Sequence, residues 1–320
     1  MSPSPRQIPP AVPVVGRFAP SPTGALHFGS LVAAVGSYCA ARHSGGRWLL
    51  RIEDLDTPRV VPGAADQILA TLEALGFCWD GEVLWQSRRQ EAYAAALTTL
   101  IERGLVYPCA CSRREILASA PHPGDEGPVY PGHCRGGLPA GRTPRALRIV
   151  TPQETIGFTD GVYGRQEQQL ACEVGDFVLR RADGLYAYQL AVVVDDAASG
   201  VNQVVRGADL LGSTPRQIFL LQRLGLPVPE YLHLPLVLAT DGSKISKRHG
   251  IVAGTPAAGP QLAAALRWLG QPLPFELEHA PPAEILAWGI ACFDASRITP
   301  RRDGLTTAGA ESGGNFTAPG

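Results

Sequence analysis

Val14-Val-Gly-Arg-Phe-Ala-Pro-Ser-Pro-Thr-Gly-Ala-Leu-His-Phe-Gly-Ser30 is a short apolar run that leads into a loop rich in proline and glycine. The apolar start predicts a buried strand, and the pattern after the loop predicts a helix over Leu26–His43 that ends at Gly45. Trp48–Glu53 is an apolar run typical of a second buried strand, and a helix is predicted from about Gly63 to Leu75. The segment therefore begins an alternation of strands and helices.

The alternation continues with a helix from Ser87 to Arg103. Ser87 and Gln90 match the capping-box pattern that opens a helix, and Gly104 follows its predicted end. Strands that alternate with helices are typical of an α/β fold, in which crossover helices connect the strands of a parallel sheet.

The regular pattern is lost between residues 106 and 185, where glycine, proline and cysteine are frequent and Asp183-Gly184 predicts a hairpin turn. It resumes with predicted strands over Leu190–Val194 and Val201–Arg206 and a helix from Pro215 to Leu224. We therefore predict a sheet that is interrupted by an insertion and then completed. The predicted segments are a disordered leader (1–13), the first half of the sheet domain (14–105), the insertion (106–185), the second half (186–225), a C-terminal region with two short helices over Gln261–Leu269 and Ala283–Phe293 (226–301), and a disordered tail (302–320).

The composition is that of a water-soluble globular enzyme. Hydrophobic residues make up 45% and charged residues 18% of the 320 residues, and no apolar run reaches the roughly 18–20 residues of a membrane span. The proline-rich start lacks the apolar core of an export signal, so we expect a cytoplasmic protein without a membrane partner. A net charge of −1 argues against a strongly basic nucleic-acid binder, although arginines can still gather on one face.

Lysine occurs at only two positions, Lys244 and Lys247, whereas arginine occurs at 26. Both lysines lie in a predicted loop flanked by Asp241-Gly-Ser and His249-Gly. Lysine offers phosphate a compact charge on a flexible stem, and arginine offers a planar fork. The pattern indicates a phosphate-handling loop, and chance retention in a solvated loop is the alternative.

The predicted start of the first helix is a second candidate for phosphate binding. Backbone N–H groups at a helix start favour an anion, and Gly29 permits close approach of a nucleotide. His27 could donate a hydrogen bond to a phosphate oxygen, although a lone histidine is more often structural. The lysine loop far downstream in the same chain favours the phosphate interpretation for both segments.

At these two segments the chain resembles the class I aminoacyl-tRNA synthetases, specifically their glutamyl branch. The family's two signature motifs match His27-Phe-Gly29-Ser30 and Lys244-Ile-Ser-Lys247-Arg248, although Phe28, Ser30, Ile245 and Arg248 depart from the usual letters. The longer stretches Arg17-Phe-Ala-Pro-Ser-Pro-Thr-Gly24 and Leu50-Arg-Ile-Glu-Asp-Leu-Asp56 are more specific. The resemblance covers about residues 14–250 and implies a class I synthetase-type Rossmann sheet split by a zinc-containing insertion.

The resemblance also implies a mechanism. A carboxylate attacks the α-phosphate of ATP, with Mg²⁺ accompanying the nucleotide, and gives an aminoacyl-adenylate and pyrophosphate. Positioning and positive charge supply the catalysis. The implied catalytic residues are His27, Lys244 and Lys247, and the implied ATP contacts are His27, Gly29, Ser246 and Lys247.

Recognition of glutamate needs partners for one ammonium and two carboxylates. Arg51 and Glu53 lie two apart on a predicted strand and share a face, so Glu53 could meet the ammonium or pair with Arg51 instead. Arg206 ends a predicted strand and could hold a carboxylate with both arms of its fork, and Tyr188 supplies a hydroxyl. The resemblance implies glutamate contacts at Arg17, Phe18, Ala19, Pro20, Ser21, Glu53, Tyr188 and Arg206, with Arg17 and Arg206 on the side-chain carboxylate.

Three of the seven cysteines, Cys109, Cys111 and Cys134, cluster within the predicted insertion. Three thiolates are one ligand short of a tetrahedral zinc site, and His122, His133 and Tyr130 are the nearby candidates for the fourth position. Unrelated thiols are the alternative. The resemblance implies a structural zinc held by Cys109, Cys111, Tyr130 and Cys134, with His133 as the second choice for the fourth ligand.

About 70 residues follow His249, fewer than the helical anticodon-binding domain of standard glutamyl synthetases needs. In this respect the chain resembles the truncated group of glutamyl-queuosine tRNA(Asp) synthetases. That resemblance implies tRNA-independent activation of L-glutamate by ATP and its transfer to queuosine in the anticodon stem-loop of tRNA(Asp), by a monomer. A ligase that charges a tRNA 3′ end and a non-catalytic tRNA-binding paralogue are the alternatives.

Overall fold

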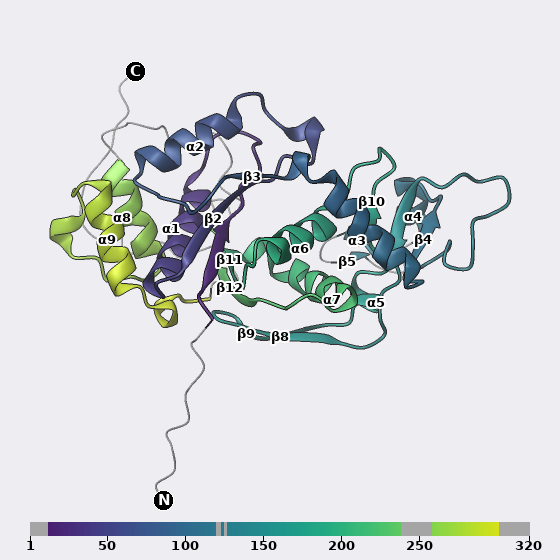
Figure 1. Ribbon diagram of the computed structural model, residues 1–320. Helices are drawn as coiled ribbons and strands as arrows, with labels where there is room; N and C mark the ends of the chain where they lie inside the picture. Colours follow the sequence, from purple (N-terminus) through teal and green to yellow (C-terminus); the bar gives the residue numbers. More distant parts are fainter. Residues whose placement is uncertain (1–11, 120–122, 125–126, 238–257, 301–320) are drawn as a thin grey trace, which may run out of the picture.

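The computed structural model describes residues 12–119, 123–124, 127–237 and 258–300. Within these ranges the chain forms an α/β body with small helices at one end and an antiparallel module at the other (Figure 1). Each described helix is too short or too polar to cross a membrane.

The first part of the sheet is parallel, as the sequence predicts. β1 (Val15–Phe18) pairs with β2 (Arg47–Ile52), which pairs with the short β3 (Leu84–Trp85), in the order β1-β2-β3. α1 (Phe28–His43) and α2 (Ala64–Ala74) form the crossovers. The predicted helix over Leu26–His43 and the predicted strand over Trp48–Glu53 are confirmed to within two residues.

The second part of the sheet has the order β11-β12-β8-β9. β11 (Gln203–Gly207), β12 (Glu230–Leu234) and β8 (Ile156–Asp160) are parallel, and β9 (Gly164–Gln168) forms an antiparallel hairpin with β8. The amide of Asn202 donates to the Val15 carbonyl at 3.1 Å, so β11 lies beside β1 and the two parts adjoin. The flanking helices are α6 (Tyr188–Ala198) and α7 (Thr214–Leu224).

The predicted strand over Leu190–Val194 is wrong, because these residues lie inside α6. Leu190 to Val193 are all buried. A short run of buried apolar residues can be a strand or one part of a helix with neighbours on every side, and periodicity does not separate the two. The helix predicted from Pro215 is confirmed in α7, which Gly225 ends with a φ of 73°.

The predicted capping box at Ser87 is also wrong. The structure has no side-chain cap on α3 (Gln90–Glu102), and the Ser87 hydroxyl instead donates to the Asp54 carboxylate at 2.6 Å. Ser87 therefore fastens the segment after β3 to the loop after β2. The hydrogen bond of Ser87 to the distant Asp54 therefore replaces the expected local bond to the start of α3.

The middle of the chain carries an antiparallel sheet in the order β10-β7-β4, formed by β4 (Val106–Cys109), β7 (Ala146–Ile149) and β10 (Val178–Arg180). It lies at the opposite end of the molecule from α8 (Ala258–Trp268) and α9 (Pro282–Cys292) (Figure 1). The remaining elements are α4 (Arg113–Ser119), α5 (Leu170–Glu173), β5 (Pro123–Gly124), β6 (Gly127–Pro128) and the 3₁₀ turns Thr57–Arg59, Gln86–Arg88, Ala208–Ser213, Phe275–Leu277 and Ala295–Arg297.

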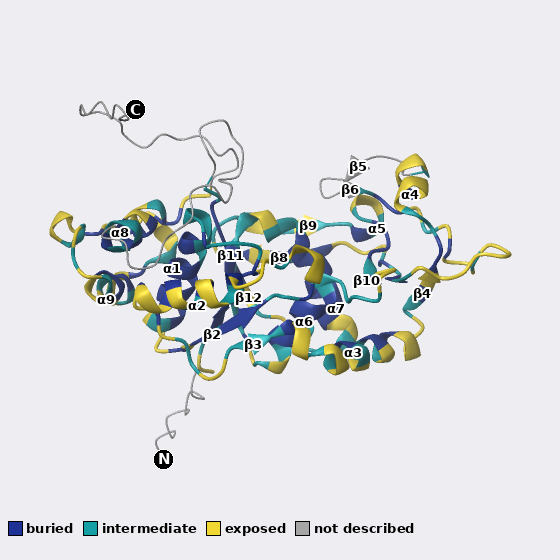
Figure 2. Cartoon of the chain, turned by 90° about the horizontal axis from the view of Figure 1, so that it is seen from above, coloured by how far each residue is buried: buried dark blue, intermediate teal, exposed yellow. Residues whose placement is uncertain are grey.

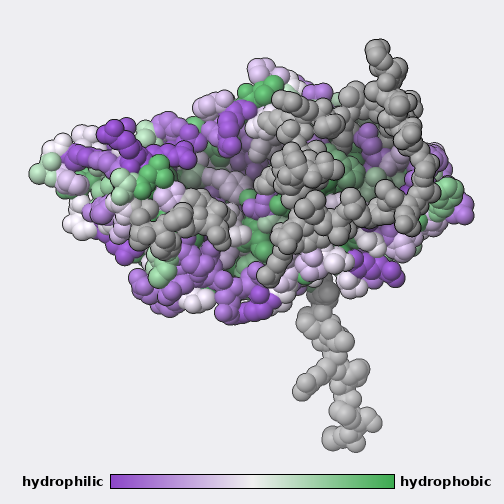
Figure 3. All heavy atoms as spheres, turned by 180° about the vertical axis from the view of Figure 1, so that it is seen from behind, coloured by the Kyte–Doolittle hydropathy of each residue, from purple (hydrophilic) through white to green (hydrophobic). Residues whose placement is uncertain are grey.

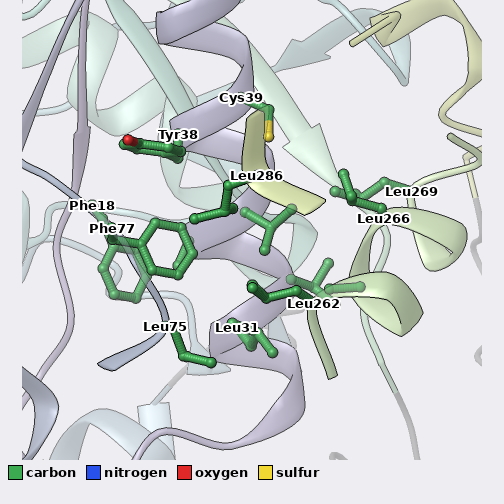
Figure 4. Close-up of a cluster of buried hydrophobic side chains, with 14 of the residues drawn as sticks. Phe18, Leu31, Tyr38, Cys39, Leu75, Phe77, Leu262, Leu266, Leu269 and Leu286 are labelled. Carbon is green, nitrogen blue, oxygen red and sulfur yellow. The ribbon is translucent and has the colours of Figure 1, made fainter. Parts of the chain in front are cut away.

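The main core surrounds α1, which packs against β1, β2, α8 and α9 (Figure 4). Tyr38 of α1 meets Trp48 and Phe77 edge-on, with ring centroids 4.9 and 5.1 Å apart. Leu262, Leu266 and Leu286 cover another side of this helix. Gly36 allows a close approach here, because an added Cβ would lie 2.6 Å from the Leu234 Cδ1 of β12 and this side chain would have to shift. This core fixes α1, and with it the turn that precedes the helix, against the sheet.

A second core lies between α6 and α7 and the strands β8, β11 and β12, and buried stretches of both helices are seen in Figure 2. Among the described residues on the face shown in Figure 3, hydrophilic residues are frequent at the periphery and a group of hydrophobic residues lies near the middle.

Candidate active site

A cavity of about 340 Å³ lies at the carboxyl ends of β1, β2, β11 and β12. This is the edge at which parallel α/β sheets bind ligands, because the loops there diverge to opposite faces. The expected glutamate contacts and the described members of the ATP set all line this one cavity: Arg17, Phe18, Ala19, Pro20, Ser21, His27, Gly29, Glu53, Tyr188 and Arg206. The expected residues Lys244, Ser246 and Lys247 lie outside the described residues.

One end of the cavity is the turn before α1. His27 occupies the N-cap position of α1, and its Nδ1 accepts the Ser30 amide at 3.2 Å. A neutral imidazole that accepts at Nδ1 carries its proton on Nε2, which lies 3.2 Å from the Ser30 hydroxyl. An added Cβ at Gly29 would lie 3.2 Å from the imidazole, so glycine keeps this turn tight. The ring N–H can donate to the Ser30 hydroxyl or to an anion that binds at this helix start.

The other end of the cavity carries the charged residues. Glu53 follows β2 directly and pairs with Arg51 at 3.1 Å, so the ion pair considered as an alternative is present. Glu53 lines the cavity nevertheless. Burial raises the pKa of its carboxyl above the ordinary value, against the pull of Arg51 and Arg17. A further cation in the cavity would stabilise the ionised form of this buried carboxylate.

Asp196 is a neighbour of the candidate site that the family motifs did not predict. It lies on α6, and its carboxylate contacts the Arg17 Nε at 3.3 Å and the Arg51 Nη1 at 2.5 Å. Burial opposes ionisation, but the two guanidinium groups hold the pKa of Asp196 below its usual value. The only sequence signal is the pair Asp195-Asp196 at the end of an otherwise apolar run. Asp196 therefore holds the side chain of Arg17, which lines the cavity, and that of Arg51, which does not.

Arg206 is the last residue but one of β11, and only 5% of its surface is exposed. Its Nε donates to His233 at 3.1 Å, and its Nη2 donates to the Thr214 hydroxyl at 2.8 Å. The Nη1 atom is buried and has no partner among the described residues. A buried donor of this kind normally has an acceptor, so the geometry favours an anionic ligand at this position.

Tyr188, the first residue of α6, completes this wall of the cavity. Burial and the charge of Glu53 raise the pKa of its phenol, which therefore remains protonated and able to donate a hydrogen bond.

A second chamber of about 550 Å³ adjoins the first. Both are lined by Ala19, Ser21, Glu53, Tyr188, Asp209 and Leu210. The second chamber additionally has Asp56 on its wall, which pairs with Arg59 and, at 3.1 Å, with Arg181. Two ligands could therefore meet across a shared wall.

The predicted cysteine cluster is assembled in the antiparallel module. The Sγ atoms of Cys109, Cys111 and Cys134 lie within 4.8 Å of one another. The Tyr130 hydroxyl lies 3.4 Å from the Cys109 Sγ and 3.5 Å from the Cys111 Sγ. The His133 ring lies 6.2 Å from the Tyr130 ring, centroid to centroid, and His122 lies outside the described residues.

Comparison with known proteins places the chain in a family. Residues 13–255 match the family model of the class I tRNA synthetases (E and Q), catalytic domain. The chain belongs to this class I synthetase family. It has the α/β catalytic fold of that family, with its parallel sheet.

Curated relatives within this family are similar over most of their length. A protein of Geobacter sulfurreducens named glutamyl-Q tRNA(Asp) synthetase is 58% identical over 297 residues, which is 90% of this chain and 95% of the relative. A protein of the same name from Dechloromonas aromatica is 59% identical over 278 residues, 86% of this chain and 92% of the relative.

The family fold extends to solved structures. The glutamate-tRNA synthetase of Elizabethkingia anophelis has a TM-score of 0.74 and 26% identity, and the similarity covers 92% of this chain and 68% of that one. The glutamate tRNA ligase of Elizabethkingia meningosepticum, solved with its amino acid, gives the same TM-score over 91% of this chain and 67% of that one.

Proposed function

We propose that this protein activates L-glutamate with ATP in the absence of tRNA and transfers the glutamate to the queuosine base in the anticodon of tRNA(Asp). The observation that carries the proposal is the cavity that joins the His27 turn to Glu53, Tyr188 and Arg206 in a chain with close relatives named for this reaction. An acidic amino acid and a nucleotide can both be accommodated at this sheet edge.

In the first step a glutamate α-carboxylate oxygen attacks the α-phosphorus of ATP. The bond between the α-phosphorus and its bridging oxygen breaks, and pyrophosphate leaves with that oxygen. His27 donates from its ring to a phosphate oxygen, and Gly29 lets the nucleotide approach the backbone. Lys244, Ser246 and Lys247 would stabilise the departing pyrophosphate, and Mg²⁺ would enter with ATP. Removal of one such donor lowers the rate by roughly 10²–10³.

Glutamate is recognised at the opposite end of the cavity. The Glu53 carboxylate receives the ammonium, and the buried Arg206 Nη1 donates to the side-chain carboxylate. Arg17, held by Asp196, adds positive charge, and Tyr188 adds a hydroxyl. Glutamine is selected against because a neutral amide satisfies a buried guanidinium poorly.

The acceptor nucleoside would enter through the second chamber. A hydroxyl of the acceptor must reach the activated carbonyl, where its oxygen forms the ester bond, AMP leaves with the bridging oxygen and the hydroxyl proton is released. Ser21, Glu53 and Tyr188 line both chambers. Arg59 and Arg181 have exposed side chains, 76% and 41% respectively, and can reach phosphates of an anticodon loop. The proposed tRNA contacts Arg59 and Arg181 line only the second chamber, so their loss would impair transfer and leave activation intact.

We further propose that Cys109, Cys111, Cys134 and Tyr130 hold a structural zinc ion. The Cys111 and Cys134 sulfurs are 3.6 Å apart. Two ligands of a tetrahedral zinc with Zn–S bonds of about 2.3 Å are separated by about 3.8 Å, so the spacing fits the ion. The site would brace the module that follows β4, within the predicted insertion over 106–185 and between the two halves of the sheet. The protein would act as a cytoplasmic monomer.

Glutamate-dependent ATP–pyrophosphate exchange without tRNA tests the first step. Exchange is expected with L-glutamate, and no exchange with L-glutamine. Exchange that requires tRNA would favour a glutamate-tRNA ligase, and no exchange under either condition would favour a tRNA-binding paralogue. Labelled glutamate is then supplied with tRNA(Asp) that carries or lacks queuosine, and only the modified tRNA should become labelled.

Arg181→Gln tests the acceptor chamber. It should reduce transfer to tRNA(Asp) about tenfold at fixed salt while exchange remains within about twofold of wild type, because a rim contact to phosphate does not touch glutamate or ATP. Arg165→Gln is the matched control, since Arg165 also has an exposed ion pair, with Glu167 on the β9 strand. Equal transfer by both variants would remove Arg181 from the acceptor site.

A further inference from the structure

A buried chain of polar side chains connects the middle of the polypeptide to the amino-acid end of the cavity. Asp160 ends β8, His233 lies on β12, and Arg206 lies on β11. The Asp160 Oδ2 is 2.6 Å from the His233 Nδ1, and the His233 Nε2 is 3.1 Å from the Arg206 Nε. The side chains of Asp160 and His233 are fully buried.

The hydrogen-bond partners of His233 determine which ring nitrogen carries the proton. The Arg206 Nε–H can only donate, so the His233 Nε2 must accept. The ring proton then lies on Nδ1 and is donated to Asp160. The Thr214 hydroxyl, 3.2 Å from the same Nε2, has its proton directed to the Leu210 carbonyl at 3.1 Å and accepts from the Arg206 Nη2.

The surroundings favour a neutral imidazole in this orientation. Burial lowers the pKa of His233, and the charge of Arg206 lowers it further, against the hydrogen bond to Asp160. The Tyr231 ring stacks on the imidazole at 6.1 Å between centroids, with 12° between the ring planes. Asp160 is itself fixed, because its Oδ1 accepts the amides of Val162 and Tyr163 at 3.0 and 2.9 Å.

We propose that Asp160 and His233 are positioning residues that set the Arg206 guanidinium for the substrate side-chain carboxylate and so determine selection of glutamate over glutamine. The Nε and Nη2 atoms of Arg206 are occupied by His233 and Thr214, and the buried Nη1 alone has no partner among the described residues. The guanidinium group is rigid and planar, so fixing its Nε and Nη2 atoms also fixes the direction in which Nη1 donates. The inference rests on the proposed glutamate activation.

Asp160→Asn is the most informative variant, because it keeps the shape of the side chain. With the amide oxygen toward Val162 and Tyr163, the NH₂ group faces the His233 Nδ1 and forces the ring proton onto Nε2. That proton then opposes the Arg206 Nε–H and displaces the guanidinium. We expect the KM for glutamate to rise about tenfold or more, the KM for ATP to stay within about twofold, and the preference for glutamate over glutamine to fall.

The two amide replacements of His233 separate positioning from simple packing. His233→Gln can place a carbonyl near the former Nε2 and still accept from Arg206, whereas His233→Asn reaches only the Nδ1 position toward Asp160. We expect the glutamine variant to keep the lower KM for glutamate. Asp176→Asn is the matched control, since Asp176 is another fully buried carboxylate, bonded to Tyr107 and Arg135 away from the cavity. It should lower the melting temperature with little change in KM.

Imidazole ¹⁵N spectra of the wild-type protein provide a second readout. The His233 signals are those that are missing from the spectrum of His233→Gln or of His233→Asn. A protonated Nδ1 is expected. An Nε2–H tautomer, equal KM values in the two His233 variants, or an unchanged KM for glutamate in folded Asp160→Asn would each overturn the proposal. Absence of glutamate-dependent exchange in the wild type would instead remove the proposed function.

Discussion

The cavity and the cysteine cluster are assembled in opposite ways. Arg17 and Asp196, which hold one wall of the cavity, are 179 residues apart in sequence, whereas Cys109 and Tyr130 are separated by 21 residues. The cavity wall consists of buried charges that are paired between the β1 and β2 strands and α6, and the cluster consists of thiols and a phenol from one small module. The cavity therefore depends on the whole fold, and the cluster depends on local chain geometry and, as we propose, on a metal.

Asp196→Ala should have the largest effect. It leaves the buried guanidinium groups of Arg17 and Arg51 without their shared carboxylate, and breaking a buried pair in this way destabilises a protein by about 3–5 kcal/mol. We expect a lower free energy of unfolding in urea and no detectable glutamate-dependent exchange. Glu167→Ala, which removes one partner of an exposed pair, serves as the control and should change little. A stable, active Asp196→Ala protein would show that the cavity wall does not need this brace.

Cys134→Ser should have an intermediate effect that is confined to the other region. Loss of one of four proposed ligands should lower the bound zinc measured by metal analysis, and the melting temperature should fall by more than about 5 °C. Glutamate-dependent exchange measured well below that temperature should persist, because the cluster does not line the cavity. Cys172→Ser, at an exposed free cysteine, is the control. Wild-type protein without zinc would contradict the metal assignment.

The pH dependence of glutamate binding should show a smaller effect. Glu53 must be ionised to receive the ammonium, so the KM for glutamate should rise as the pH falls through the pKa of this carboxyl. Because burial raises that pKa, the rise should begin at a higher pH than for an exposed glutamate. Exchange measured between about pH 5 and pH 8 tests this. Glu53→Gln should have a high KM that varies little over that range.

The smallest expected effect is that of Ser87→Ala. It removes the hydroxyl and leaves the amide bond to Asp54, so unfolding should be easier by about 1 kcal/mol. A Ser87→Ala protein whose α3 helix loses amide protection first would instead support the local capping box. Hydrogen exchange of α3 distinguishes the two.

Local pattern predicted the elements whose length or ends carry strong signals. The α1 helix agrees with prediction because its apolar run is too long for a typical strand and Gly45 follows its end, and β2 agrees because it is a short apolar run that follows this turn. The Leu190–Val194 segment did not, because its residues are buried on every side within α6 and branched side chains favour a strand only when no neighbour decides otherwise. The family motifs predicted Glu53, Tyr188 and Arg206, which line one cavity. Asp160 and His233 carry no local signal, and Asp196 carries only that of the Asp195-Asp196 pair.

The amino-acid sequence alone was sufficient to predict the alternation of strands and helices, the synthetase family and the side chains that line the cavity. These follow from the spacing of apolar residues, from turn residues and from the family motifs. Only the folded chain decided which carboxylate or imidazole would hold each arginine. Such partners lie tens to hundreds of positions apart, and their choice follows from strand register and burial, where an unpaired charge is too unfavourable to persist.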